Sequence, residues 1–174
     1  MTRGATDMPQ PVQYRGMTLL VPDNDSEWKE FYEHARAHRL VMRACASCGL
    51  MRYPPTHACP WCTSLEWTWR EVSGRGTIHS YEIVVHAIQP GFKDATPYPV
   101  VLVELDEQRG QPTPDEALRI VANLVRADGS MEEEKNVAIG RRVRVVFHDL
   151  ADHLALPQFT LADEPPAGRV WRLG

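Results

Sequence analysis

Apolar side chains follow a helical repeat near the N-terminus. They recur at positions i, i+3, i+4 and i+7, which places them on one face of an α-helix: Trp28, Phe31, Tyr32 and Ala35. Asp25 and Ser26 are candidate N-caps, and acidic residues follow in the first turn, where the helix dipole favours them. The pattern predicts a helix over residues 26–38, preceded by a polar, proline-marked arm over residues 1–25.

The pattern leaves two roles open for this helix. Its apolar stripe can pack against the rest of the chain, as amphipathic helices ordinarily do. Alternatively, an aromatic-rich helix can dock a partner protein through Trp28, Phe31 and Tyr32, because aromatic side chains are enriched at protein interfaces.

From residue 65 onward the period changes to that of β-strands. Alternating or continuous apolar segments predict strands at residues 67–72, 77–86, 98–105, 118–125, 142–147 and 157–161. The polar segment 106–116, which contains Pro112 and Pro114, predicts a mobile excursion. Short strands joined by turns, without a long helix, predict a small closed barrel of the OB type over residues 65–162, with a small sandwich as the alternative. Residues 163–174 are expected to form a tail.

All four cysteines lie in two Cys-x-x-Cys pairs with ten residues between them: Cys45, Cys48, Cys59 and Cys62. Each pair predicts a tight knuckle, and two facing knuckles place four thiolates in a tetrahedron, the geometry of structural Zn²⁺ sites. Gly49 follows the first pair, where a knuckle often needs a positive φ. Because four protein ligands leave no open coordination position, we expect a structural zinc centre in a helix-and-ribbon segment over residues 26–64.

Other uses of these cysteines remain open. A rubredoxin-type iron site takes the same four ligands, and the sequence does not distinguish it from zinc. Two disulfides would require an oxidising compartment, whereas a redox motif would use one Cys-x-x-Cys pair beside a βαβ pattern. His57 lies two residues before Cys59 and is expected to be a loop residue, since four thiolates already complete the site.

Composition narrows the classes of partner. The formal net charge is −4, whereas nucleic-acid-binding proteins are usually basic, so the charge argues against nucleic acid as a partner. No apolar run approaches the length of a membrane-spanning helix, and residues 1–10 lack the pattern of a secretory signal. We therefore expect a reduced, cytoplasmic protein.

Several short motifs follow one another after the aromatic helix. They are Cys45-Ala46-Ser47-Cys48-Gly49, Tyr53-Pro54-Pro55, Cys59-Pro60-Trp61-Cys62, Val72-Ser73-Gly74-Arg75-Gly76-Thr77-Ile78, Pro99-Val100-Val101, Ile139-Gly140-Arg141-Arg142-Val143 and Pro157-Gln158-Phe159. Their order over residues 26–162 resembles that of the DUF35 family. The resemblance implies a mainly β fold with an N-terminal helix, a rubredoxin-like zinc ribbon and an OB-fold β-barrel.

The resemblance also implies an accessory subunit. Similar proteins accompany thiolases, thiolase-like ketosynthases, sterol-carrier-type aldolases or acyl-CoA hydratases, stabilise the catalytic chain and help to bind CoA. A thiolase- or aldolase-type partner in a hetero-oligomer is therefore expected, with a heterotetramer as the form that thiolase-type dimers suggest. Degradation of aromatic or steroid acyl-CoAs is the expected context.

Binding of CoA requires cations for its phosphates and apolar surface for its pantetheine arm. The candidate phosphate ligands are Arg75, Lys93, Arg142 and Arg144, and the candidate contacts for the arm are Phe92 and Tyr98. Each of these arginines is equally suited to an ordinary solvated strand face.

Catalytic residues are not evident. The chain contains no GxSxG, P-loop, GxGxxG or HExxH motif, and its seven histidines are scattered. An accessory subunit without intrinsic activity is therefore the main hypothesis. A single-stranded nucleic-acid-binding OB module and an independent enzyme are the alternatives.

Overall fold

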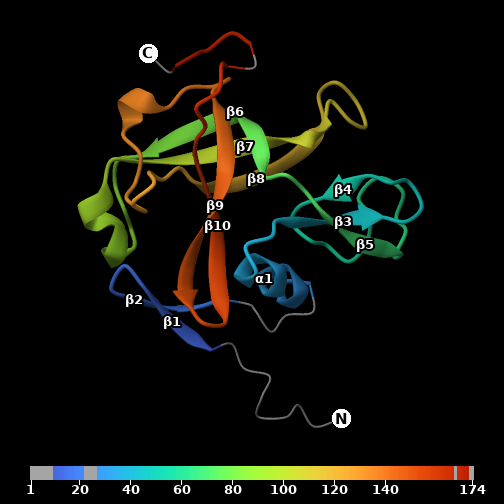
Figure 1. Cartoon of the computed structure of the whole chain (residues 1–174), viewed down its shortest axis with the longest axis horizontal. Coiled ribbons are helices and arrows are strands. Elements are labelled where there is room, and N and C mark those ends of the chain that lie inside the picture. The colour runs from blue at the N-terminus through green and yellow to red at the C-terminus, as the bar shows by residue number, and fades with distance from the viewer. Residues whose placement is uncertain (1–9, 22–26, 167, 173–174) are drawn as a thin grey trace.

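The computed structural model describes residues 10–21, 27–166 and 168–172. Its strands form three sheets of two, five and three strands. Figure 1 shows the three-stranded sheet to one side of the five-stranded sheet, with the only α-helix of the described residues below the three-stranded sheet and beside β9 and β10. None of the helices in the described ranges is long and apolar enough to cross a membrane.

The five-stranded sheet is a barrel of the OB type. Its strands are β6 (Arg75–Val84), β7 (Tyr98–Arg109), β8 (Ala117–Asn123), β9 (Arg142–Ala151) and β10 (Leu154–Leu161). They pair in the order β10-β9-β6-β7-β8, and a parallel bridge from Leu124 to Phe159 brings the β8 end against β10. This nearly closed path confirms the predicted barrel and excludes the sandwich.

The barrel interior follows the period of two that the sequence shows. Val101, Val103 and Leu105 of β7 alternate with more exposed residues and are fully buried. Gly76 lies where β6 crosses closely over β7, and a Cβ atom there would come within 2.5 Å of the Glu104 carbonyl oxygen. A larger residue at position 76 would therefore separate the two strands.

The three-stranded sheet belongs to the cysteine-rich segment. It consists of β3 (Val41–Cys45), β4 (Met51–Arg52) and β5 (Trp67–Glu71), with β3 in the centre. The predicted barrel domain begins at residue 65, yet β5 pairs along β3 from Cys45–Trp67 to Val41–Glu71. Because the chain leaves the second knuckle directly antiparallel to β3, this strand completes the ribbon sheet before the chain enters the barrel.

The helix α1 (Lys29–Arg36) packs against β10 and β3. Phe31 and Ala35 are buried, and Trp28 and Tyr32 pack partly buried against the same core. The helical stripe is therefore used within the chain. The candidate N-caps Asp25 and Ser26 lie outside the described residues.

The N-terminal arm forms the hairpin β1 (Pro11–Tyr14) and β2 (Met17–Leu20). The Arg15 side chain donates to the carbonyl of Gly91 at 2.8 Å, in the 3₁₀ turn η1 (Pro90–Ala95). Tyr14 accepts a hydrogen bond from Gln158 of β10. The described part of the arm thus lies on the barrel. A second 3₁₀ turn, η2 (Glu134–Asn136), precedes β9.

The first part of the segment predicted to be a mobile excursion belongs to the barrel and connects it to the ribbon, whereas residues 110–116 form a loop. The sequence-based strand ended at Leu105, but β7 continues to Arg109. Gln108 is buried, accepts from the Met51 amide at 2.6 Å and donates to the Met51 carbonyl at 2.9 Å. Its neighbour Glu107 accepts from the Ser73 amide at 2.6 Å. The polar composition of this segment therefore reflects contacts to backbone groups, since a side-chain amide can replace a missing strand.

Replacing Gln108 with alanine should destabilise the protein by about 1–3 kcal/mol, because it leaves the buried amide and carbonyl of Met51 without partners. Urea unfolding of the full chain measures this change. Gln111→Ala is the matched control, since Gln111 is exposed in the same segment. Equal stability of the two variants would contradict the connecting role of Gln108.

Candidate metal centre

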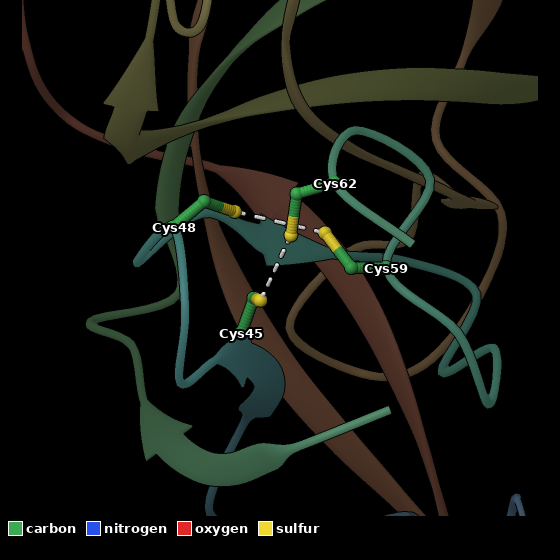
Figure 2. Close-up of side chains that lie close together, drawn as sticks. All are labelled: Cys45, Cys48, Cys59 and Cys62. Carbon is green, nitrogen blue, oxygen red and sulfur yellow. Dashed lines mark hydrogen bonds between the residues drawn. The ribbon is translucent and has the colours of Figure 1, made fainter. Parts of the chain in front are cut away.

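Four cysteine sulfurs converge at the end of the ribbon sheet. The Sγ atoms of Cys45, Cys48, Cys59 and Cys62 all lie within 4.8 Å of one another (Figure 2). The Cys45–Cys62 pair is 3.5 Å apart and the Cys48–Cys59 pair 3.7 Å. A tetrahedron with metal–sulfur bonds of about 2.3 Å has edges of about 3.8 Å, so the four sulfurs fit a tetrathiolate metal site.

The two knuckles have equivalent backbone geometry. The Gly49 amide donates to the Cys45 carbonyl at 3.0 Å, and the Thr63 amide donates to the Cys59 carbonyl at 2.9 Å. Gly49 has φ +76° and Thr63 has φ +62°. The expected positive φ at Gly49 is confirmed. The second knuckle adopts the same turn with a threonine, which carries a steric cost that the surrounding ribbon must offset.

Electrostatics within the cluster favour a bound cation. A backbone hydrogen bond from Cys48 lowers the pKa of the Cys45 thiol to about 6. Although the backbone amide of Ser64 favours the Cys62 thiolate, the Cys45 sulfur beside it raises the pKa of Cys62 to about 12. Four adjacent thiols therefore cannot all ionise by themselves, whereas a metal ion at their centre offsets the repulsion.

The described residues hold one group of three or more potential ligands close enough for a metal, and these four cysteines form it. All four are free thiols. His57 is exposed in the loop between the knuckles and does not belong to the group.

The candidate CoA ligands fall into two separate groups. Arg75 and Arg144 are paired neighbours on β6 and β9, and Arg142 lies next to them. Phe92, Lys93 and Tyr98 lie at or near η1, beyond the other end of β6. A regular strand as long as β6 spans about 30 Å. The structure therefore does not place all six residues around one site.

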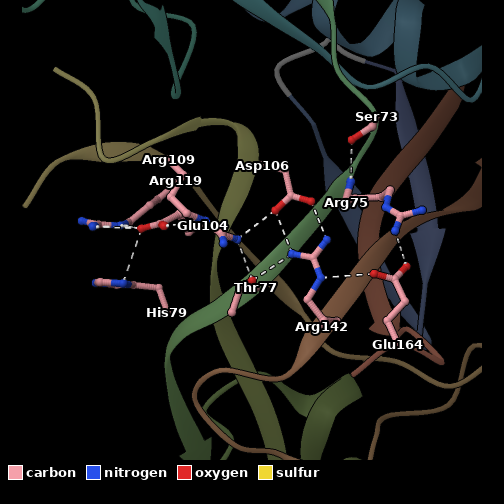
Figure 3. A network of polar contacts seen from close by, with 10 residues as sticks. All are labelled: Ser73, Arg75, Thr77, His79, Glu104, Asp106, Arg109, Arg119, Arg142 and Glu164. Carbon is pink, nitrogen blue, oxygen red and sulfur yellow. Dashed lines mark hydrogen bonds and ion pairs between the residues drawn. The ribbon is translucent and has the colours of Figure 1, made fainter. Parts of the chain in front are cut away.

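Among the three arginines, the charge of Arg142 is neutralised inside the protein. Its guanidinium binds both carboxylate oxygens of Asp106, with 2.7 Å between Nη1 and Oδ1, and its Nε lies 3.2 Å from Glu164 (Figure 3). Arg75 lies 2.8 Å from Glu164 and is half exposed. Arg144 is exposed.

The aromatic candidates also have partners within the chain. The Phe92 ring lies 5.2 Å from the Tyr98 ring and 6.0 Å from Tyr14, and the Arg15 guanidinium lies 5.2 Å from its centroid. Lys93 is exposed. Phe92 and Tyr98 thus form part of the contact between η1 and the N-terminal hairpin.

The candidate docking residues form one aromatic cluster. The centre of the Trp28 ring lies 5.5 Å from that of Phe31 and 5.9 Å from that of Tyr32. The ring centre of Tyr53, in the ribbon, lies 5.8 Å from that of Trp28. Phe31 lies inside the protein, while Trp28 and Tyr32 retain exposed edges.

Comparison with known proteins identifies the family. The model described as "ChsH2, rubredoxin-like zinc ribbon domain" matches residues 33–68, and "ChsH2, C-terminal OB-fold domain" matches residues 69–148. A "DUF35 domain-containing scaffold protein" of Methanothermobacter thermautotrophicus is 30% identical over 118 residues, 66% of this chain and 76% of that protein. The chain belongs to the DUF35 family.

Two further relatives of this DUF35 protein bear on its function. A "Probable enoyl-CoA hydratase alpha subunit" of Thermomonospora curvata is 35% identical over 129 residues, which cover 74% of this chain and 35% of that protein. The chain thus spans about a third of that relative. A chain of the solved structure "Ltp2-ChsH2(DUF35) aldolase" is 32% identical with a TM-score of 0.63, over 79% of this chain and 95% of that chain.

Sequence reasoning missed the polar side chains that organise this DUF35 fold. Asp106 and Gln108 are predicted to lie in a loop, because the alternation that predicts β7 breaks after Leu105, where Asp106 and Glu107 are both exposed before the buried Gln108. Arg43 and Arg52 are charged residues in a ribbon strand pair and are nevertheless buried. No pattern in the sequence indicates their burial, because it arises from tertiary contacts. Arg43 packs over the rings of Trp67 and Trp69, and Arg52 binds the carbonyls of Thr56 and His57 before the second knuckle.

Asp106→Asn should destabilise the protein at pH 7 by about 1–3 kcal/mol, because the charge of the mostly buried Arg142 loses its carboxylate partner. Hydrogen bonding from Arg142 lowers the pKa of Asp106 below its usual value. Its carboxylate therefore contributes stability above the unfolded-state pKa of about 3.9, and this contribution is lost as the pH falls through the lower native pKa.

Unfolding free energies at pH 7 and below pH 4 test this expectation. The difference in unfolding free energy between wild type and Asp106→Asn should be smaller at low pH. Metal release at low pH affects both proteins alike. Asp115→Asn, in the exposed loop after β7, is the control. A gap that does not change with pH would contradict the role assigned to the Asp106 charge.

Proposed function

We propose that this protein is a non-catalytic zinc-ribbon and OB-fold subunit that docks and stabilises a thiolase-type partner and helps to bind the CoA part of an acyl-CoA. The partner would be a 3-oxoacyl-CoA thiolase or a sterol-carrier-type aldolase. One observation carries this proposal. The protein is similar to a chain of the structure named "Ltp2-ChsH2(DUF35) aldolase" over 95% of that chain's length. The scaffold and hydratase alpha-subunit names of other relatives support a role in an acyl-CoA enzyme complex.

The proposed metal is Zn²⁺ in a structural role. Four thiolates at tetrahedral distances leave no position for a substrate or water, so the ion would hold the two knuckles and supply no chemistry to a reaction. A segment as short as this ribbon has little core of its own, and metal binding would provide much of its folding free energy. Elemental analysis of the purified protein distinguishes zinc from iron.

The proposed docking surface includes the exposed edges of Trp28 and Tyr32. Phe31 would anchor the helix from inside, and Tyr53 would connect the aromatic cluster to the ribbon. A partner that covers these edges would contact both the helix and the metal-ordered segment. Partner binding would then depend on the metal.

The proposed contact with the CoA phosphates centres on Arg144. Its strand neighbour Arg75 can contribute, since its ion pair with Glu164 is half exposed and such pairs are weak. Arg142 would hold this region in shape through Asp106 and would not bind the ligand. Lys93, Phe92 and Tyr98 would contact a ligand only at the other end of β6. The acyl group would be held mainly by the partner, with aromatic or steroid acyl-CoAs as the proposed class.

Co-purification from the native host tests the accessory-subunit proposal. The tagged chain is isolated and its companions are identified by mass spectrometry. A stoichiometric thiolase- or aldolase-type protein supports the proposal. Recovery of the chain alone or with nucleic acid contradicts it. Enzymatic turnover by the isolated chain also contradicts it.

Cys45→Ser should lose the metal and the complex together, because three thiolates cannot complete the tetrahedral site. Metal content and co-purified partner are measured on the same preparation. Ser47→Ala is the control, because Ser47 lies in the same knuckle and its hydroxyl makes an exposed bond to Ser64. A metal-free Cys45→Ser protein that still binds and stabilises its partner fully would refute the proposed role of the metal.

A further inference from the structure

A cleft of about 240 Å³ lies between the barrel and the C-terminal segment. Strands β6 and β7 contribute His79, Glu104 and Arg109 to its lining, and residues 139–140 and 168–169 complete it. Pockets for drug-sized molecules usually begin at about 300 Å³, and one water molecule occupies about 30 Å³. The cleft is therefore large enough for a small polar group with some of its water, or for one end of a longer ligand.

Backbone contacts fix the C-terminal segment beside this cleft. The Ile139 amide donates to the Trp171 carbonyl at 2.8 Å, and the Trp171 amide donates to the Ile139 carbonyl at 3.1 Å. Gly140 has φ +88°, and a Cβ atom there would come within 2.7 Å of the Arg169 carbonyl oxygen. The glycine thus allows the backbone of Arg169 to approach closely. The position of Arg169 at the cleft therefore depends on its backbone and not on its side chain.

Two arginines of this cleft have N–H groups that the described part of the chain does not use. Arg169 is exposed and makes no hydrogen bond or ion pair with the described residues. The Nε atom of Arg109 lies 3.3 Å from Glu104. Its Nη2 donates to Thr77 and Asp106, at 2.8 Å in each case, whereas its Nη1 has no such contact within the described ranges. Free guanidinium N–H groups suit the oxygens of a phosphate or carboxylate, which they can bind with two parallel hydrogen bonds.

The charged groups around the cleft have a positive sum. Glu104 is the shared partner of three side chains, whose nearest nitrogens lie 3.2 to 3.7 Å from its carboxylate: Arg119, Arg109 and His79 (Figure 3). The polar network in this figure contains four arginines and three carboxylates, so it keeps one positive charge when the histidine is neutral, and Arg169 adds a second. An excess of one sign of charge attracts counter-ions into a cleft. An excess of two matches a phosphate monoester, which carries nearly two negative charges at neutral pH, better than a carboxylate with one.

We propose that this cleft is a phosphate-binding site, in which Arg109 of the barrel and Arg169 of the C-terminal segment hold a dianionic phosphate group. Two sources have the same chemistry: the 3′-phosphate of CoA, which is a monoester, and free inorganic phosphate. The site lies outside the proposed contact of CoA with Arg144. The inference rests on the proposed function only where CoA is the source of the phosphate.

Titration calorimetry of the full chain at low ionic strength tests the proposal with three probes: CoA, 3′-dephospho-CoA and inorganic phosphate. Wild type should bind CoA about 10-fold more tightly than 3′-dephospho-CoA, because the second probe lacks the group that the charge-assisted hydrogen bonds would hold. Arg169→Met should abolish this preference and leave the affinity for 3′-dephospho-CoA unchanged. Arg169→Lys keeps the charge and should retain part of the preference. If free phosphate is the ligand, Arg169→Met should weaken its binding about 10-fold instead.

Arg172→Met is the matched control. Arg172 lies three residues further along the same segment, is exposed, and lines a different cleft. The control removes the same charge from the protein, so it separates a local effect of Arg169 from a general loss of positive charge. The Arg169 variants should fold normally, because this side chain has no polar partner in the described part of the chain. Thermal unfolding checks this, and Arg169→Gln is a second neutral variant.

Each outcome either supports the site or overturns it. A preference for CoA that depends on Arg169 supports it with CoA as the source, and Arg169-dependent binding of inorganic phosphate alone supports it with free phosphate as the source. Equal affinities of wild type and Arg169→Met, an equal loss in Arg172→Met, or no binding of any probe by wild type overturns the inference. The accessory-subunit proposal is tested separately by co-purification, and its contact with CoA by Arg144→Met, so both can stand when this site fails.

Discussion

Mutual repulsion of four sulfur atoms within 4.8 Å is the constraint on which the ribbon depends. The backbone brings them together through two equivalent knuckles, and it stabilises the thiolate of Cys45 at the expense of its neighbour Cys62. A cation at the centre removes this conflict. A bound ion would hold the two knuckles together, while the central ribbon strand β3 is held by the main hydrophobic core through Val41, Met42 and Ala44.

The ribbon is joined to the barrel by polar contacts from the extended end of β7. Gln108 occupies the place of a strand beside Met51, and Glu107 holds the amide of Ser73 where the chain passes from one sheet to the other. These contacts connect the cysteine-rich ribbon to the barrel through a few residues. A change at the cysteines can therefore reach the aromatic cluster around Trp28, which packs on both parts of the protein.

Charge is distributed differently in the two parts. At the barrel, Arg142 is neutralised by Asp106 and Glu164, so this arginine maintains the strand arrangement and Arg144 remains exposed. In the ribbon, Arg43 and Arg52 are buried against carbonyls and a tryptophan ring. Neither arrangement includes a nucleophile with a base, and the proposed function accordingly rests on docking and binding. The fold by itself does not define such a function, since OB barrels serve many roles.

The sequence alone determined the cysteine ligand set, the helix, the strands of the barrel and the family, because ligand spacing and the period of apolar residues are local properties. The tertiary structure decided which of these elements pair. It assigned β5 to the ribbon, extended β7 through Asp106 and Gln108, and separated Arg75 from Phe92 along β6. It also buried Arg43 and Arg52. These features depend on contacts between residues far apart in the chain, and a charged or polar side chain shows no local sign that such a contact will bury it.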